Sequence, residues 1–404
     1  MKLIQMMHAN GSITDTQFNQ LKAAAAEEGR NRMSSMADTN AGTDTSIPTT
    51  LDNDANTADF RQSVEDRFDE LSWLDKIKFT GDLRLRYEYN DNSTRQNAAG
   101  HNIARNRGRL RYRLGIIAAP IANLEVGAGI ASGGDDPRST NQTFGDDFSS
   151  KPIRLDYAYA AYKFNDYIEG IGGKFKFGDY LWMPTDLIWD GDINPEGASV
   201  HLHSDTAVGT TFLNSGVWVL QEFSGNSSDP YLYYVQGGQH FESDNLFASL
   251  AGTYYGYENT AQPGTFNPDY SAGTNTTTQF SVIDVNGQIG TRFGAGGKAS
   301  LIGEYVKNIH SGVGADTGYA LGAKVGWNKW AMKYLYGDLD ANAVPDTFPD
   351  SDRLGGATAM KGHEVALSYA LNDAVELGLD YYNSQSKRTT EDEQLLQADV
   401  VFSF

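Results

Sequence analysis

The segment at residues 105–117 alternates arginines with apolar residues, and this pattern most constrains how the chain can fold. Arg109, Arg111 and Arg113 occupy every second position. The positions between and after them are Leu110, Tyr112, Leu114 and Ile116. Successive side chains of a β-strand point to opposite faces, whereas a helix would distribute these arginines around its whole circumference. The segment is therefore predicted to be a strand with one basic face and one apolar face.

The same period of two recurs from Lys76 to the C-terminus, in sixteen segments. The predicted strands include residues 79–89, 105–117, 124–130, 154–159, 171–177, 198–203, 210–221, 231–241, 246–257, 280–293, 298–308, 318–327, 329–339, 363–371, 374–384 and 394–404. A tilted strand of about nine to eleven residues is long enough to cross a bilayer. Most of the segments reach this length, so strands of a membrane barrel are compatible with the pattern.

The connections between these segments alternate between short and long. Short ones lie near residues 120–123, 165–166, 204–206, 243–245, 294–297, 328 and 372–373, and the polar stretches between them are longer. A barrel with tight turns on one rim and longer loops on the other produces this rhythm, whereas a β-sandwich or propeller has no reason to separate loop lengths by parity. The predicted fold is all-β, a 16-stranded antiparallel transmembrane β-barrel.

Composition excludes several other classes. No run approaches the roughly 18 apolar residues of a transmembrane helix, and the absence of cysteine excludes disulfides and thiolate metal sites. A net charge of −20 disfavours nucleic-acid binding. We find no nucleotide-binding loop, GxSxG elbow or HExxH motif, so no cofactor, no resident metal and no enzymatic activity are expected.

Residues 1–75 are predicted to form a separate, short helical periplasmic region before the barrel at residues 76–404. Thr14 and Gln17 suggest a capping box, residues 34–57 resemble a linker, and Phe60 begins an apolar period of three and four. The second helix either docks on the barrel or forms a short oligomerising coil. No signal peptide is visible, and we expect the sequence to begin at the processed chain.

The last predicted strand ends on Phe404, which resembles the insertion signal of bacterial outer-membrane proteins. The chain resembles the outer-membrane porins of Gram-negative bacteria, and more closely the group named "putative porins". The resemblance is carried by HANGSITDTQFNQL (8–21), RLRYRLGI (109–116), the stretch at 139–159 and MPTDLIWDGDINPEG (183–197). It implies a 16-stranded barrel in the outer membrane that passes small hydrophilic solutes and assembles as a homotrimer among lipid and lipopolysaccharide.

With the apolar faces assigned to lipid, the basic side chains of the first five strands are predicted to face the lumen, because a charge at the midplane of the lipid face costs about 2–4 kcal/mol. They are Arg84, Arg86, Arg109, Arg111, Arg113, Arg154, Lys174 and Lys176. Such a basic wall would attract anions. The alternative is that the arginines pair with Asp82, Glu88, Glu125 and Asp156 and only stiffen adjacent strands.

The long connection at residues 179–196 is too apolar for a loop surrounded by solvent, since it carries Trp182 and Trp189. It is predicted to fold into the lumen as a constriction loop. Its acidic residues, Asp186, Asp190, Asp192 and Glu196, would then stand opposite the arginines and create a transverse field. Alternatively, the two tryptophans belong to the outer aromatic girdle or a subunit interface.

The predicted function is passive diffusion of small hydrophilic solutes or anions. The alternative is a plugged barrel that serves as a structural anchor or adhesin, which single-channel conductance would distinguish. Three aspartate-rich segments, 135–136, 146–147 and 346–352, are interpreted as solvated loops because they lack the ligand spacing of an EF-hand.

Overall fold

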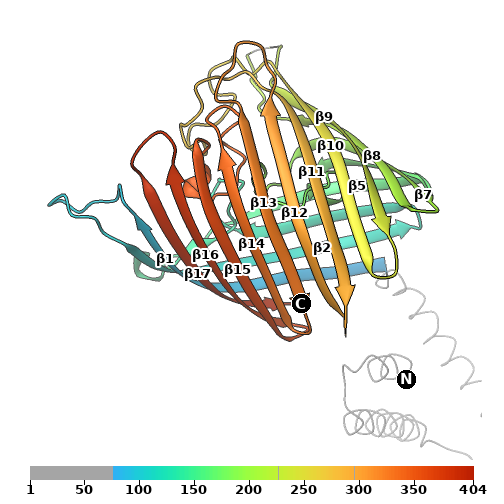
Figure 1. Ribbon diagram of the computed structural model, residues 1–404, viewed down its shortest axis with the longest axis horizontal. Helices are drawn as coiled ribbons and strands as arrows, with labels where there is room; N and C mark the ends of the chain where they lie inside the picture. The colour runs from blue at the N-terminus through green and yellow to red at the C-terminus, as the bar shows by residue number, and fades with distance from the viewer. Residues whose placement is uncertain (1–75, 226, 295) are drawn as a thin grey trace, which may run out of the picture. The chain divides into compact units, whose positions relative to one another are not determined.

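Antiparallel strands pair in chain order around a closed barrel in the computed structural model (Figure 1), which describes residues 76–225, 227–294 and 296–404. The strands are β1 (Ile77–Asn92), β2 (Arg105–Ile121), β3 (Leu124–Ser132), β4 (Gln142–Thr143), β5 (Ile153–Asn165), β6 (Ile168–Lys174), β7 (Glu196–Thr206), β8 (Gly209–Val219), β9 (Tyr231–Glu242), β10 (Leu246–Glu258), β11 (Ser281–Phe293), β12 (Gly297–Asn308), β13 (Thr317–Trp327), β14 (Trp330–Leu339), β15 (Met360–Asn372), β16 (Val375–Ser386) and β17 (Asp392–Ser403). β4 is a two-residue strand within a loop, so the prediction of a 16-stranded barrel is confirmed by the remaining strands.

The predicted helical and linker region at residues 1–75 lies outside the described residues. Within the described part of the chain, no helix is long and apolar enough to span a membrane.

The barrel closes where the first strand pairs with the last. β1 is antiparallel to β17, with Asp82 opposite Ser403 in the register. Beyond the end of the strand, the Gly81 N–H donates to the Phe404 carbonyl at 2.8 Å, and the Phe404 N–H donates back at 3.0 Å. Closure leaves no unpaired strand edge, which a spanning sheet requires because lipid offers no hydrogen-bond partners.

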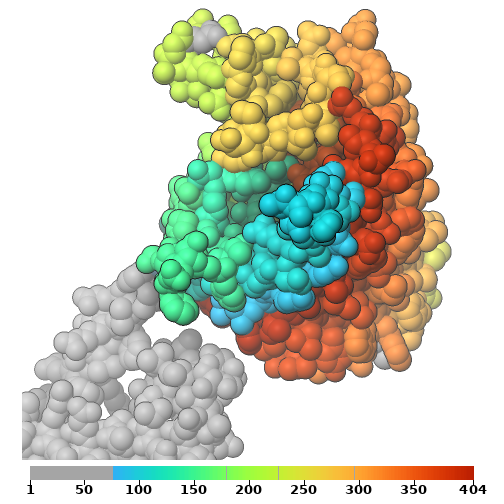
Figure 2. Space-filling model, turned by 90° about the vertical axis from the view of Figure 1, so that its left-hand side faces the viewer, coloured from blue at the N-terminus to red at the C-terminus, as the bar shows by residue number. Residues whose placement is uncertain are grey.

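Connections of two alternating lengths separate the two rims. Consecutive strands are joined by short turns at Ile121–Leu124, Thr206–Gly209 and Trp327–Trp330, while the connections on the opposite rim are longer. Figure 2 shows the long-loop end, where segments from the blue, green, yellow and red parts of the described chain gather around the mouth. The parity of the loop lengths was therefore predicted correctly from the sequence.

Large apolar side chains cover the outer face of the barrel. Leu250, Ile289, Leu301 and Leu321 are each more than half exposed and alternate with buried residues on the same strands. Exposed aromatic side chains lie near the short turns: Phe164, Tyr167, Phe241, Phe293, Trp327 and Trp330. A second group lies closer to the long loops: Tyr87, Tyr305, Tyr319 and Tyr334. An apolar band between two aromatic girdles is the outer surface expected of a membrane barrel.

The predicted orientation of two early strands is wrong. A register shift between Gly129 and Ile130 leaves Asp156 unpaired in β5, so Tyr157 and Tyr159 oppose Gly129 and Gly127 on the inner face. In the sequence both tyrosines alternate with Arg154 and Asp156, and this alternation predicts that they face lipid. A β-bulge adds one residue to a strand and reverses the facing of everything after it, which strict alternation cannot reveal.

The reversal extends into β6. Ile171 is buried and pairs with Ala161 on the inner face, and Phe175 and Phe177 after the strand are buried inside the barrel. In the sequence these three residues alternate with Lys174 and Lys176, which predicts that they face lipid, and that prediction is also wrong.

Two connections on the long-loop rim fold into the barrel. We name residues 175–195 the first inner loop and residues 340–359 the second inner loop. Leu187, Ile188 and Trp189 of the first loop pack with inward side chains of the wall such as Trp218 and Tyr255, all of them buried. The barrel therefore encloses an apolar core on one side of its interior.

Candidate channel interior

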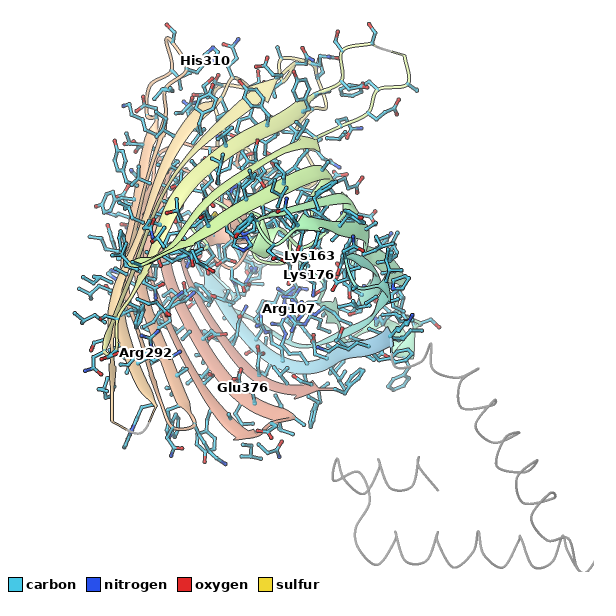
Figure 3. The ribbon with its side chains drawn as sticks, turned by 90° about the vertical axis from the view of Figure 1, so that its right-hand side faces the viewer. Arg107, Lys163, Lys176, Arg292, His310 and Glu376 are labelled. Carbon is cyan, nitrogen blue, oxygen red and sulfur yellow. The ribbon has the colours of Figure 1, made fainter. Side chains whose placement is uncertain are left out.

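The basic side chains of β1 and β2 form a ladder on the inner wall. The cross-strand pairs Arg84–Arg111 and Arg86–Arg109 place like charges directly opposite each other. Figure 3 shows nitrogen atoms gathered around the labelled Arg107, within the ring of strands. The alternating sequence therefore leads directly to a dense positive surface, because an inward side chain recurs at every second residue of both strands.

Carboxylates are interleaved with this ladder and separate the guanidinium groups. Asp82 lies 2.9 Å from Arg111 and 2.6 Å from Arg113. Glu88 pairs with Arg109 at 2.9 Å and also with Arg107. The alternative prediction, that the arginines form ion pairs with carboxylates of adjacent strands, is thus correct for Asp82 and Glu88.

A third carboxylate comes from β17. Arg86 forms a bidentate pair with Asp399, both bonds being 2.7 Å long, and Arg84 lies 3.8 Å from the same group. The face still carries an excess of positive charge. Its arginines are Arg84, Arg86, Arg107, Arg109, Arg111 and Arg113, and the carboxylates paired with them from the strands are Asp82, Glu88 and Asp399.

A cavity of about 960 Å³ reaches from this ladder to the short-turn end. Arg84 and Arg111 line it from one side, and the labelled Arg292 and Glu376 of Figure 3 line it from β11 and β16. Its charged lining comprises the cations Arg84, Arg111, Arg292, Lys298, Lys324 and Lys333 and the anions Glu242, Glu376, Asp380 and Asp399. The wall of the cavity therefore carries more cations than anions.

The first inner loop is held against the far wall by polar contacts. The Trp182 N–H donates to Gln236 Oε1 at 2.8 Å, and Gln236 Nε2 donates to the Trp182 carbonyl at 2.9 Å. Lys324 Nζ donates to the Pro184 carbonyl at 2.8 Å. Because these partners lie on β9 and β13, the loop crosses the interior from β6 to the opposite side.

The tryptophans of this loop do not face lipid. Trp189 is buried and stacks on Phe348 of the second inner loop, with ring centroids 4.7 Å apart. Trp182 is half-buried and meets the ring of His240 edge-on at 5.6 Å. The alternative placement in the outer girdle is therefore wrong.

Asp186 is the most strongly paired acid of the loop. It lies 2.7 Å from Arg353 and 3.0 Å from Lys333. Burial alone would raise the pKa of Asp186, but the charges of Arg353 and Lys333 outweigh burial and hold its pKa well below the ordinary value. Asp186 is therefore ionised and joins the loop to the second inner loop and to β14.

Asp190 and Asp192 have different surroundings. Burial, together with the nearby Asp192 carboxylate, raises the pKa of Asp190 to about 7, although Asp190 accepts backbone hydrogen bonds from Ser351 and Asp192. Asp192 Oδ1 lies 3.5 Å from Arg113. Of the acids predicted to oppose the arginine ladder, Asp192 makes the direct contact.

Three predicted residues lie at or near the long-loop rim. Arg154 pairs with Asp135 at 2.5 Å, with about half of its side chain exposed. Lys174 pairs with Glu196 at 3.2 Å. Arg154, Lys174 and Glu196 therefore lie apart from the β1–β2 ladder.

Lys176 lies farther inside, although β6 ends at Lys174 and not at residue 177 as the sequence predicts. Its ammonium group stands 5.1 Å from the centroid of the Tyr157 ring, and it borders the same cavities as Arg113. Figure 3 shows the labelled Lys176 within the ring of strands.

Three smaller cavities of about 380, 320 and 190 Å³ follow the gap between the first inner loop and strands β2, β3 and β5. The first two share Asp192 and Asn194, the last two share Arg113 and Lys176, and Asp156 borders all three. Charged side chains therefore line the space on this side of the interior, in contrast to the apolar packing on the other side.

The second inner loop corrects a sequence interpretation. Residues 346–352 had been interpreted as a solvated segment, but Asp346 and Asp350 are buried. Asp346 accepts hydrogen bonds from Ser271, Thr274 and Asn275 of the connection between β10 and β11. Buried aspartates need such partners, and a sequence does not show whether a polar loop will find them.

Several charged residues that line the interior were not predicted from the sequence. They are Lys298, Lys324, Lys333, Arg353 and Glu364. Arg353 is buried between Asp186 and Glu364. On β12 and β14 both faces carry apolar residues, because the first inner loop packs on the inner wall, so a period of two did not distinguish lumen from lipid.

The comparisons with known proteins agree with this architecture. The solved structure titled "High pH structure of Pseudomonas putida OprB" superposes with a TM-score of 0.54, covering 83% of this chain and 96% of that chain at 13% identity. A mutant of Rh. blastica porin has a TM-score of 0.47 at 12% identity, with 81% of this chain and 100% of that chain covered. At such identities the OprB similarity concerns the fold alone. No curated protein matches the chain.

The family described as "Putative porin" matches residues 90–282 and 274–400, which is well over half of the chain. The match covers strands β2 to β16 entirely and most of β17. The chain therefore belongs to this porin family, whose members are channels in the outer membrane of Gram-negative bacteria.

Proposed function

We propose that this porin passes small hydrophilic solutes by passive diffusion and favours anions, with selectivity set between the β1–β2 arginine ladder and the two inner loops. The observation that carries this proposal is the excess of arginines over strand carboxylates on the inner face of β1 and β2. A barrel of this strand number is wide enough to hold an aqueous channel, and rings or walls of charge set which ions enter it.

The acids of the inner loops support a transverse field. Asp192 stands 3.5 Å from Arg113, and Asp352 stands 3.7 Å from Arg86. Negative groups of the loops thus lie on one side of the positive ladder, with a low-dielectric wall behind it, and such an asymmetric charge distribution would align dipolar solutes in the adjoining cavities.

The apolar core on the far side limits the space available. Leu187, Trp189 and Phe348 occupy the region in front of β8 to β14, so solutes would pass on the side of β1, β2 and β5. Three rim residues would then interact with solutes as they enter the mouth: Arg154, Lys174 and Glu196. Lys176 would line the passage beside Arg113.

The test is the reversal potential of the full chain in a planar bilayer under a salt gradient. We expect anion preference, and we expect Arg84→Gln and Arg111→Gln each to reduce it because both side chains line the cavity of about 960 Å³. Lys361→Gln is the control, since it removes the same charge from an exposed position between the buried Met360 and Gly362. Cation preference that is unchanged in the two arginine variants would refute the proposal.

The same recording tests the plugged-barrel alternative. The two inner loops and their apolar core are the observation that favours a plug. A plugged anchor or adhesin would give no single-channel steps, whereas the proposed channel gives ohmic steps that persist at low voltage.

We also infer a homotrimer in outer-membrane lipid and lipopolysaccharide. Small residues form a cross-strand row on the outer face, where Ala160 pairs with Gly172 and Gly172 pairs with Ala198. A surface without long side chains allows close approach of a second barrel. Native mass measurement in detergent would show three chains, and Ala198→Trp should reduce the assembly to single chains while the barrel stays folded.

A further inference from the structure

One group of buried oxygen atoms in the barrel wall has no role in the proposed channel. Asp284 and Asn286 on β11 and Glu304 on β12 face inward, and Asn286 is the register partner of Glu304. Asp284 is two residues from Asn286 on the same face, so it is the diagonal neighbour of Glu304. Asp284 and Asn286 are completely buried, and Glu304 is 4% exposed.

Each side chain of this group uses one polar atom and leaves an oxygen without a partner. Asn286 Nδ2 donates to Asp284 Oδ2 at 2.5 Å, and the Thr185 hydroxyl of the first inner loop donates to Glu304 Oε2. Asp284 Oδ1, Asn286 Oδ1 and Glu304 Oε1 have no hydrogen-bond partner in the described part of the chain. Three buried acceptor oxygens without a donor therefore lie on adjacent positions of two paired strands.

The charge of the group is also uncompensated. Among the described residues, no lysine, arginine or histidine forms an ion pair with Asp284 or Glu304, whereas the nearby Glu364 pairs with both Lys333 and Arg353. Two buried carboxylates on neighbouring strands cannot both remain ionised without a balancing cation, because the interior gives little solvation to either charge.

We propose that Asp284, Asn286 and Glu304 hold a calcium ion, with the Thr185 hydroxyl as a neighbouring ligand or orienting group. The donors are carboxylate, amide and hydroxyl oxygens, which is the donor set that Ca²⁺ takes from proteins, with water completing its coordination. A charge of +2 neutralises the two carboxylates. The Asn286 amide nitrogen and the Thr185 hydroxyl already hold one oxygen of each carboxylate, so the other oxygen of each remains free to bind the ion.

The ion would act on the position of the first inner loop. Thr185 contacts Glu304, and the adjacent Pro184 and Asp186 are held by Lys324 and Lys333. A bound calcium ion would balance the charge of Glu304, so its carboxylate would stay deprotonated and accept the hydrogen bond from the Thr185 hydroxyl. This hydrogen bond would fix this part of the loop to β12. A shared proton between Asp284 and Glu304 is the competing explanation, and it would leave the group without any metal.

The experiment uses the full-length protein in detergent, stripped with EGTA and then titrated with CaCl₂. The measurements are bound calcium per chain by equilibrium dialysis and the thermal unfolding midpoint by circular dichroism. The variants are Asp284→Asn, Glu304→Gln and the double variant, which keep side-chain volume. Asp147→Asn is the control for calcium bound at exposed acidic loops, since the Asp147 side chain lies on the long-loop rim.

We expect the wild type and Asp147→Asn to bind one tightly held calcium per chain and to gain about 2–4 °C in midpoint. The Asp284→Asn and Glu304→Gln variants should lose both effects. Without calcium, these variants should unfold at a higher temperature than the stripped wild type, because they remove uncompensated charge. This rise also shows that the variants fold.

Two outcomes would overturn the proposal. Equal calcium binding and equal midpoint shifts in the wild type and the double variant would place the bound metal elsewhere. The second outcome is a thermal unfolding midpoint that does not respond to calcium but rises on acidification in the wild type alone. It would mean that Asp284 and Glu304 share a proton and bind no metal. Neither outcome depends on ion selectivity, so the calcium site can fail while the proposed channel function stands.

Discussion

The guanidinium group of Arg353 lies 2.7 Å from the Asp186 carboxylate, and this ion pair joins the two inner loops inside the barrel. Lys333 of β14 lies 3.0 Å from the same carboxylate. Arg353 also pairs with Asp350 of its own loop and with Glu364 of β15. One half-buried carboxylate therefore links two loops to the wall, and the geometry of the interior depends on it.

Replacing Asp186 by asparagine should loosen the first inner loop. Breaking a buried ion pair by removing one partner costs about 3–5 kcal/mol. The cost here should lie below that range, because Arg353 keeps Asp350 and Glu364 as partners and Lys333 keeps Glu364. We expect noisier single-channel current and faster cleavage of residues 175–195 by protease. Asp192→Asn is the matched control, since Asp192 has a single cationic partner at 3.5 Å. Equal noise and equal cleavage in the two variants would contradict a special role for Asp186.

The ionisation of Asp190 should make loop packing depend on pH. Its pKa is raised to about 7 from an ordinary value of 3.8, first by burial and then by the Asp192 charge. An acid with a raised pKa binds its proton more tightly in the folded loop, so the stability of that packing falls as pH rises from about 4 to about 7. Protease cleavage of the loop should therefore increase between about pH 4 and pH 7 and level off above that.

Asp190→Asn tests this assignment because it mimics the protonated side chain. The variant should show the low-pH cleavage rate at every pH. If the wild type and the variant keep the same pH profile, another group controls the loop.

The aromatic contact between the loops should be cooperative. Trp189 and Phe348 stack with centroids 4.7 Å apart, and such pairs contribute about 0.5–1.5 kcal/mol beyond the area they bury. Trp189→Ala and Phe348→Ala should each widen the channel and raise conductance. The double variant should change loop stability by less than the sum of the single variants. If the two single variants change loop stability additively, the rings do not stabilise each other. Trp327→Ala removes an exposed tryptophan on the outer face and provides the control.

The closing seam of the barrel should be sensitive to one methyl group at Gly81. A Cβ atom there would lie 2.5 Å from the Arg113 carbonyl oxygen and 2.6 Å from the Phe404 ring. Gly81→Ala should therefore slow assembly and lower the temperature at which the folded band disappears on a semi-native gel. Gly252→Ala places the same methyl group in open space on β10 and should behave as the wild type. Similar loss in both variants would point to a general effect of alanine rather than to the seam.

Alternation along the chain was sufficient to predict the barrel. Residues 105–117 were assigned to a strand from three arginines at every second position, and the structure has β2 at Arg105–Ile121. The period of a strand is a local property of the backbone, so it is visible wherever one face meets lipid and the other meets water.

Prediction failed where a second surface covered the inner wall or where the strand was irregular. Tyr157 was assigned to lipid because nothing in the sequence marks the bulge at Asp156. Ile302 and Val306 of β12 are buried by contacts inside the barrel, so β12 is apolar on both faces. The buried Arg353 was missed because its partners come from three segments far apart in the sequence.

The sequence by itself determined the strand order, the alternation of turns and loops and the basic inner face of β1 and β2, because each depends on residues close together in the chain. The tertiary structure alone decided which carboxylates Arg109, Arg111 and Arg113 contact, which of the four loop acids reaches Arg113, and that a second loop also folds inward. These relationships depend on distances between elements that come together only when the barrel closes, and on the desolvation of charges within it.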